Sequence, residues 1–224
     1  QEVNQALYNR KEELEELKRA YLDISKGTAI VLYGRRRVGK SELCLEFLKG
    51  KKGTYFQCTE EGDYANIRKM QQELTAFAGE PFGTIGIDSW ENLFSAFLRF
   101  YPPKEKFVLI IDEFPYLARR NMAIASIFQK IWDTTLSKHN ICLILCGSSI
   151  RMMEKKVVSA KSPLYGRRSG LWKLEPLQPE HAKEFFPKKG IEELLKLYFI
   201  TGGVPAYLLK FEGSATLDEN IMQR

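Results

Sequence analysis

The feature that most constrains this chain is a full match to the pattern G-x-x-x-x-G-K-[ST], which spans Gly34–Ser41. It directly follows the short apolar run Ala29–Tyr33 and directly precedes a helical pattern that begins at about Lys40. By chance the pattern arises in roughly 1% of chains of this length, before its flanks are considered. A strand before it and a helix after it are what a phosphate-binding loop requires. The segment therefore predicts a strand–loop–helix unit that binds a phosphorylated ligand.

Each position of this loop has a physical role in holding phosphate. The glycines Gly34 and Gly39 let the backbone curl until successive N–H groups point at phosphate oxygens, and the helix N-terminus adds the positive end of its dipole. Lys40 is predicted to reach the β- and γ-phosphates, and Ser41 to give its hydroxyl oxygen to Mg²⁺. The predicted nucleotide contacts also include Arg37, Val38 and Glu42.

A pair of acids, Asp112 and Glu113, follows the continuous apolar run that begins at Phe107. An acid at the carboxyl end of a buried parallel strand lies at the edge where ligands bind in α/β sheets. Asp112 is suited to hold Mg²⁺, commonly through water, and Glu113 to orient and deprotonate an attacking water. Alone, such a pair equally describes a strand followed by a polar turn. Downstream of a phosphate-binding loop, it predicts a nucleotide-hydrolysing site.

Strand-like and helix-like segments alternate along the chain, which predicts an α/β fold with a mostly parallel sheet. The expected strands are Ala29–Tyr33, Thr54–Cys58, Phe107–Asp112, Ile141–Cys146 and Leu171–Leu174. Apolar residues recur at helical spacing over about 7–24, 40–50, 64–78, 90–98 and 124–135. The basic stretch 151–170 carries little periodicity and is expected to be a partly mobile loop.

From Gln178 on, helical patterns occur without strands. We therefore predict a core at 1–177 and a small helical subdomain at 178–224. The last helix of this subdomain is expected to be cut short at Arg224. Because the sequence begins at Gln1 rather than Met, an upstream segment is expected as well.

Composition excludes several classes of protein. With 44% hydrophobic and 28% charged residues among 224, the chain can bury a core, which excludes a disordered protein. No apolar run approaches the about 20 residues that cross a bilayer, so we expect no membrane contact. Four cysteines without a CxxC pair and two histidines leave almost no ligands for zinc. The absence of disulfide-like spacing favours the reducing cytoplasm.

The formal net charge of +6 allows an anionic partner without requiring one. Short basic clusters are either solvated surface or contacts to nucleic-acid phosphates. They are Arg35–Arg37, Lys51–Lys52, Lys155–Lys156, Arg167–Arg168 and Lys188–Lys189. The sequence does not indicate whether the three arginines inside the phosphate-binding loop face solvent or a partner.

Several further segments add to the evidence from the two motifs. They are Tyr8–Leu14, Phe114–Leu117, Leu145–Ser149 with Met152, Pro163–Arg167 and Gly202–Leu208. Together with the motifs, they resemble the archaeal ATPase family of prokaryotic P-loop NTPases, in the ASCE division near the AAA+ and STAND ATPases. The resemblance spans nearly the whole chain. It implies a three-layer α/β sandwich with strand order 5-1-4-3-2, adenine as the base, and ATP and Mg²⁺ as ligands.

The resemblance also implies a sensor and an arginine finger. Ser148 would face the γ-phosphate as a polar sensor, although it also suits an N-cap of the next helix, and Ser149 competes for the sensor position. Arg167, or less favourably Arg168, would stabilise the transferred phosphoryl charge from within the chain or from a neighbouring copy. A solvated surface arginine is the alternative for both.

The resemblance also implies which residues line the base side of the nucleotide. Asn9 and Arg10 would line it, although Arg10 equally suits an ion pair with Glu13. Pro205, in Gly203-Val-Pro, would close over the adenine with a flat apolar ring. A proline there also suits the first turn of a helix, and the two roles are compatible.

These patterns predict a Mg²⁺-dependent ATPase of AAA+/STAND type that hydrolyses ATP to ADP and phosphate. Its expected catalytic residues are Lys40, Glu113, Ser148 and Arg167, and its expected metal ligands are Ser41 and Asp112. The first alternative is a regulatory switch that holds nucleotide and turns over slowly. The second is a nucleic-acid-binding module tuned by ATP. Self-association is left open, as is DNA contact through regions beyond Arg224, where family members continue into a winged-helix segment.

Overall fold

The computed structural model describes residues 10–23, 26–164 and 166–222. Its centre is a parallel five-stranded sheet with the spatial order β2-β3-β4-β1-β5. The strands are β1 (Gly27–Gly34), β2 (Gly53–Gln57), β3 (Phe107–Asp112), β4 (Ile141–Gly147) and β5 (Gly170–Leu174). This order is the predicted 5-1-4-3-2 read from the other edge, so the predicted fold class is confirmed.

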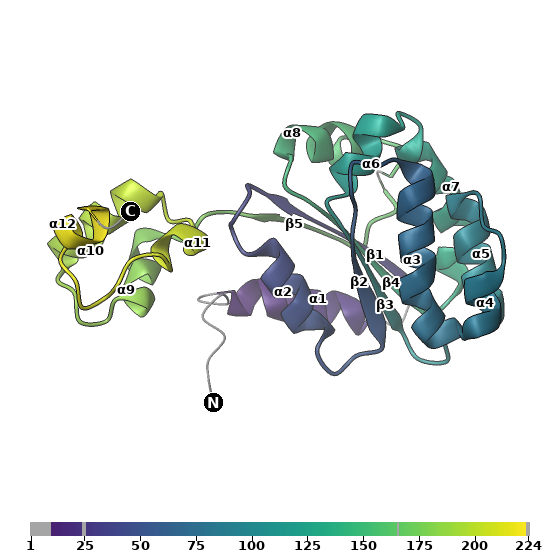
Figure 1. Cartoon of the computed structure of the whole chain (residues 1–224), viewed down its shortest axis with the longest axis horizontal. Helices are drawn as coiled ribbons and strands as arrows, with labels where there is room; N and C mark the ends of the chain where they lie inside the picture. Colours follow the sequence, from purple (N-terminus) through teal and green to yellow (C-terminus); the bar gives the residue numbers. More distant parts are fainter. Residues whose placement is uncertain (1–9, 24–25, 165, 223–224) are drawn as a thin grey trace.

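Helices cover both faces of the sheet, which gives three layers (Figure 1). One face carries α1 (Lys11–Tyr21) and α2 (Lys40–Leu48). The other carries α3 (Asp63–Ala78), α4 (Glu80–Thr84), α5 (Trp90–Phe100), α6 (Phe114–Arg120), α7 (Ile124–Thr134) and α8 (Ile150–Met153). Because both faces are covered, β3 and β4 are buried along their whole lengths, as their continuous apolar sequences predict.

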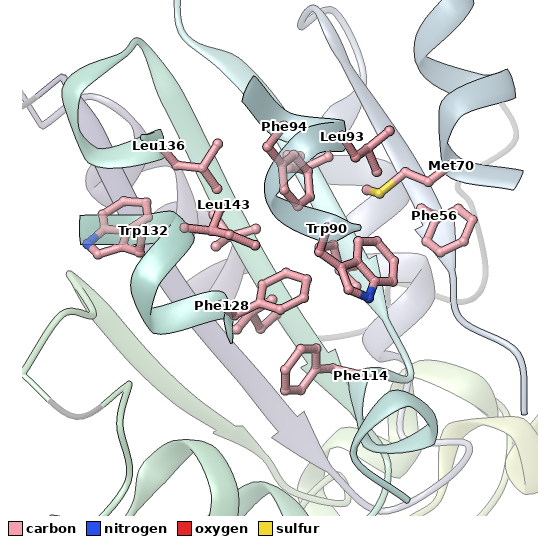
Figure 2. Close-up of a cluster of buried hydrophobic side chains, with 14 of the residues drawn as sticks. Phe56, Met70, Trp90, Leu93, Phe94, Phe114, Phe128, Trp132, Leu136 and Leu143 are labelled. Atoms are coloured by element: carbon pink, nitrogen blue, oxygen red, sulfur yellow. The ribbon is translucent and has the colours of Figure 1, made fainter. Parts of the chain in front are cut away.

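The larger apolar cluster lies between the sheet and α3, α5 and α7, and it is rich in aromatic rings (Figure 2). The ring of Phe128 lies 5.5 Å from that of Trp90 and 5.1 Å from that of Phe114, measured between centroids. Phe114 directly follows Glu113, and its side chain is fully buried. Burying a phenylalanine contributes about 1.5–3 kcal/mol. Phe114 therefore anchors the chain immediately beyond the acid pair.

The predicted loop over 151–170 is wrong for its first part. Residues 150–153 form α8, and a π-helical turn continues it over Glu154–Val158. Met153 and Val157 are fully buried, four residues apart on one helical face. A glutamate and two lysines separate these two anchors in the sequence, so the apolar periodicity is too short to be recognised. Helices α4 and α6 were not predicted either.

After β5, the described chain contains α9 (Ala182–Phe185), α10 (Ile191–Thr201), α11 (Pro205–Leu208) and α12 (Leu217–Met222). These helices lie beyond β5, apart from the layers around the sheet (Figure 1). They have their own apolar cluster, formed by Leu177, Phe186, Leu194, Leu197 and Leu208. The division after residue 177 stays a prediction. The separate cluster favours a division near this point, although it already includes Leu177. Within the described ranges, no helix has the length and apolar character needed to cross a membrane.

Candidate functional site

The predicted phosphate-binding loop connects β1 to α2, with Gly34 ending the strand and Lys40 beginning the helix. A Cβ atom at Gly34 would collide with the carbonyl oxygen of Leu174 in β5, so the close approach of the two strands requires glycine. Gly39 has a φ of 96°, a conformation that side chains with a Cβ rarely adopt. Two glycines of the motif are therefore explained by backbone geometry before any ligand is considered.

Lys40 is held inside this loop, with an exposed fraction of only 6%. Its Nζ donates to the carbonyl oxygens of Gly34, at 2.9 Å, and Arg35, at 2.8 Å. Burial lowers the pKa of Lys40, and the nearby Glu113 and Asp112 carboxylates oppose that shift. The ammonium group therefore lies where phosphate oxygens can replace the two carbonyls as its partners.

Asp112 ends β3 and contacts Ser41, which lies in the first turn of α2 at the end of the phosphate-binding loop. The Ser41 hydroxyl donates to its Oδ2 at 2.8 Å, and the backbone N–H of Glu113 donates to its Oδ1 at 2.8 Å. The Asp112 residue is 2% exposed. A hydroxyl and a carboxylate in contact are the hard oxygen donors that Mg²⁺ prefers, so this pair fits the predicted metal.

Tyr55, which neither sequence motif reveals, also donates its hydroxyl hydrogen to Oδ2 of Asp112. Burial, followed by this hydrogen bond, raises the pKa of Tyr55 above its ordinary value, so the hydroxyl keeps its proton. Tyr55 lies on β2, outside both motifs and far from the acid pair in the sequence. Only the pairing of β2 with β3 brings it to the acid.

Glu113 occupies the sharp turn between β3 and α6, with a φ of 52° in the left-handed region. Its Oε2 accepts hydrogen bonds from the Ser148 hydroxyl, at 2.9 Å, and from the Ser148 backbone N–H, at 3.3 Å. Ser149, the competing position, precedes α8 and makes no side-chain cap to that helix. The structure thus brings Ser148 rather than Ser149 to the acid pair. Its role as a γ-phosphate sensor stays a prediction.

Arg10 lies against the phosphate-binding loop and is 5% exposed. Its guanidinium donates to the carbonyl oxygens of Val38, at 3.1 Å, and Glu175, at 2.6 Å, and pairs with Glu13 at 2.6 Å. Arg10 therefore makes the predicted ion pair with Glu13 and also lies beside the phosphate-binding loop. Asn9 lies outside the described residues.

A cleft of about 320 Å³ opens beside Arg10. It is lined by Arg10, Glu12, Glu13, Lys173, Glu175, Pro176, Leu177, Gln178 and His181. The Nε atom of Arg10 is buried without a hydrogen-bond partner among the described residues. The cleft lies between the start of α1 and the chain that leaves β5, beside the arginine predicted to line the base side of the nucleotide. Binding of the base in this cleft stays a prediction.

Pro205 begins α11 and is buried, so it does start a helix. Tyr207, on the same helix, has its ring 5.3 Å from the guanidinium carbon of Arg37. Arg36 in turn donates to the hydroxyl of Tyr116 on α6, at 3.1 Å. Two arginines of the phosphate-binding loop therefore contact aromatic side chains, one on α11 and one on α6.

Within the described residues, the contacts of Arg167 direct it away from the other predicted catalytic residues. Its Nε donates to Asp133 near the end of α7, at 2.8 Å, and its Nη1 donates to the carbonyl of Pro163, at 3.1 Å. Helix α7 leads into a turn that packs on Gly27, at the amino end of β1. The pair therefore lies toward the amino ends of the strands, whereas the phosphate-binding loop lies at their carboxyl ends. This position disfavours Arg167 as an arginine finger acting within the chain.

Comparison with known proteins agrees with this geometry. The sequence model described as an ATPase domain predominantly from Archaea matches residues 7–211. The chain belongs to that family. Its core is therefore that of a P-loop ATPase, as the resemblance implied.

Relatives with similar sequences include two proteins of Methanocaldococcus jannaschii. One, an uncharacterized protein, is 40% identical over 202 residues, which are 90% of this chain and 43% of the relative. The other, an uncharacterized ATP-binding protein, is 57% identical over 44 residues, which are 20% of this chain and 73% of the relative. The chain thus spans less than half of the first relative's length.

Solved structures with this fold include a Walker-type ATPase of Pyrococcus abyssi, with a TM-score of 0.73 and 24% identity over 96% of this chain and 71% of that one. The ORC1 protein of Aeropyrum pernix, solved with DNA, has a TM-score of 0.66 and 15% identity over 92% of this chain and 58% of that one. A STAND protein of Pyrococcus horikoshii has a TM-score of 0.54 and 19% identity, over 96% of this ATPase domain and 31% of that chain. At these identities the likeness concerns the fold.

Proposed function

We propose that this ATPase domain binds ATP with Mg²⁺ and hydrolyses it to ADP and phosphate. The observation that carries the proposal is the convergence of two hydroxyl–carboxylate pairs beside the buried Lys40. Ser41 contacts Asp112, and Ser148 contacts Glu113. The two acids are consecutive in the sequence, yet they face different partners. One pair suits metal binding and the other suits water activation.

Each residue has a distinct part in the proposed reaction. Lys40 neutralises phosphate charge, and Ser41 with Asp112 holds the metal. Bound Mg²⁺ would neutralise charge on the phosphoryl group that is transferred. Glu113 orients the attacking water and accepts its proton. Ser148 donates to Glu113 and responds to the γ-phosphate.

Glu113→Gln tests the proposal, because it keeps the side-chain shape and removes the base. Turnover of Mg·ATP is expected to fall about 10²-fold or more, while ATP binding stays within about twofold of wild type. Glu105→Gln is the matched control, since Glu105 is exposed and its contact to Lys52 spans 4.0 Å. Retention of full turnover by Glu113→Gln would rule out Glu113 as the base.

The second candidate function is a nucleotide-dependent switch with little turnover. The contact between Arg37 and Tyr207 favours it, because it links the phosphate-binding loop to the helical segment beyond β5. Recovery of bound ADP from the purified protein, with negligible phosphate release, would support the switch. Rapid multiple turnover would exclude it.

Self-association and DNA contact are also part of the proposal. Hydrolysis per chain that rises with protein concentration would indicate sites completed between copies, with Arg167 as the candidate residue acting across the interface. DNA contact is proposed only for regions beyond this chain, on the analogy of the ORC1 protein solved with DNA.

A further inference from the structure

We propose that Tyr55 is a positioning residue for the metal site: its hydroxyl holds the Asp112 carboxylate in the orientation that receives Mg²⁺. The inference rests on the proposed function, because it concerns the same metal site. It adds a residue that neither sequence motif contains, on a strand that neither motif occupies.

The sheet register explains why a tyrosine at this position can do this. Tyr55 pairs with Ile110 on β3, two residues before Asp112. Side chains alternate along a strand, so Ile110 and Asp112 lie on one face of the sheet, about 6.6 Å apart. Tyr55 packs against the apolar cluster on that same face, beside α2. A long, rigid side chain leaning along the strand can span two residue positions, and it places its hydroxyl on Oδ2.

The hydrogen bonds of Asp112 show what this hydroxyl adds. Within the described chain, Oδ2 accepts from Ser41 and Tyr55, and Oδ1 accepts from the backbone N–H of Glu113. A carboxylate offers about four acceptor positions, so three donors leave capacity for one more. Donors on both oxygens prevent rotation of the group. Asp112 is buried, so water cannot readily replace a donor that is lost.

The competing explanation is that Tyr55 only packs the sheet. A phenylalanine would preserve that packing, because the ring stays and the hydroxyl is lost. Tyr55→Phe therefore separates positioning from packing. Residues that orient metal ligands from outside the coordination sphere typically change metal affinity 10–100-fold when they are removed.

The chain offers a matched control in Tyr21→Phe. Tyr21 is also partly buried against the same apolar cluster, and its hydroxyl donates to the carbonyl oxygen of Lys106 at 3.2 Å. Lys106 precedes the start of β3, whereas Asp112 ends it. The control thus removes one tyrosine hydroxyl with a hydrogen bond, but at the opposite end of the strand.

The experiment measures binding of Mn²⁺, as a paramagnetic substitute for Mg²⁺, to the complex of the protein with a non-hydrolysable ATP analogue. The protein is kept in excess over the analogue, so that little free analogue remains to bind Mn²⁺. Electron paramagnetic resonance of free Mn²⁺ gives the dissociation constant without any turnover. Tyr55→Phe is expected to bind Mn²⁺ about tenfold more weakly than wild type, and Tyr21→Phe within twofold. Affinity for the analogue in EDTA is expected to stay unchanged in both variants, and their thermal midpoints show that both fold.

Mn²⁺ affinity of Tyr55→Phe within twofold of wild type would overturn the inference. An equal loss in Tyr21→Phe would overturn it too, because the effect would then not be specific to the Asp112 contact. Asp112→Asn separates this failure from failure of the proposed function. If Asp112→Asn binds Mn²⁺ at least tenfold more weakly than wild type, the metal site stands whatever Tyr55→Phe shows. If Asp112→Asn binds Mn²⁺ as tightly as wild type, the metal site and the inference fall together. If wild type binds none, the metal site and the inference fall together.

Discussion

Replacing Lys40 by alanine tests the phosphate-binding loop most directly. In the free protein the ammonium group donates to two backbone carbonyls of the loop, those of Gly34 and Arg35. Binding of ATP is expected to exchange these neutral acceptors for charged phosphate oxygens. Burial already disfavours the charged form of Lys40, as its lowered pKa shows, so a phosphate would supply the compensating charge that the carbonyls lack.

The size of the effect follows from the number of contacts that Lys40 makes. A hydrogen bond to a charged group contributes about 1.5–3 kcal/mol. Loss of one such bond to phosphate weakens binding roughly 10- to 150-fold, since about 1.4 kcal/mol corresponds to a factor of ten. Two simultaneous bonds to phosphate would place Lys40→Ala at or above the upper end of this range.

Isothermal titration of Mg·ATP, with a non-hydrolysable analogue as a second ligand, measures the dissociation constant. Lys49→Ala is the matched control, because it removes the same charge from the exposed C-terminal end of the same helix, where Lys49 pairs with Glu46. A surface ion pair of this kind contributes little. If Lys40→Ala binds Mg·ATP as tightly as wild type, the loop does not hold phosphate in the way proposed here.

Two further substitutions test the geometry of the site. Gly34→Ala introduces a Cβ against the Leu174 carbonyl, so urea unfolding is expected to show a loss of about 1–3 kcal/mol; an unchanged midpoint would contradict the close approach of the two strands. Ser148→Ala removes a hydroxyl donor to Glu113, so turnover is expected to fall roughly 10- to 100-fold with ATP affinity unchanged. Ser149→Ala, its control, should stay within twofold, and equal losses in the two variants would refute a specific role for Ser148.

Much of the candidate site could be predicted because its residues lie in two short segments with strong local constraints. The phosphate-binding loop combines glycines, a lysine and a serine at fixed spacing between a strand and a helix. The acid pair follows an apolar run that can only be a buried strand or a short buried helix. Since parallel strands present their carboxyl ends at one edge, placing the two segments together required no knowledge of packing.

Residues outside these segments were harder to place. The contact of Ser148 with Glu113 depends on β4 lying beside β3, which came from the family resemblance rather than from residue patterns. The predicted arginine finger Arg167 does not follow this rule, because its ion pair with Asp133 places it toward the amino ends of the strands. An arginine in an irregular segment carries no periodicity, so its direction depends entirely on the surrounding chain.

The sequence by itself determined the parallel α/β core, the phosphate-binding loop and the acid pair, because glycine geometry, apolar periodicity and motif spacing are local properties. Only the tertiary structure decided which side chains from distant segments meet at the carboxyl ends of the strands. Tyr55 reaches Asp112 through strand register, and Arg37 reaches Tyr207 through the position of α11. Such contacts depend on the direction of a side chain within a packed fold, and a pattern of residue types along the chain carries no information about that direction.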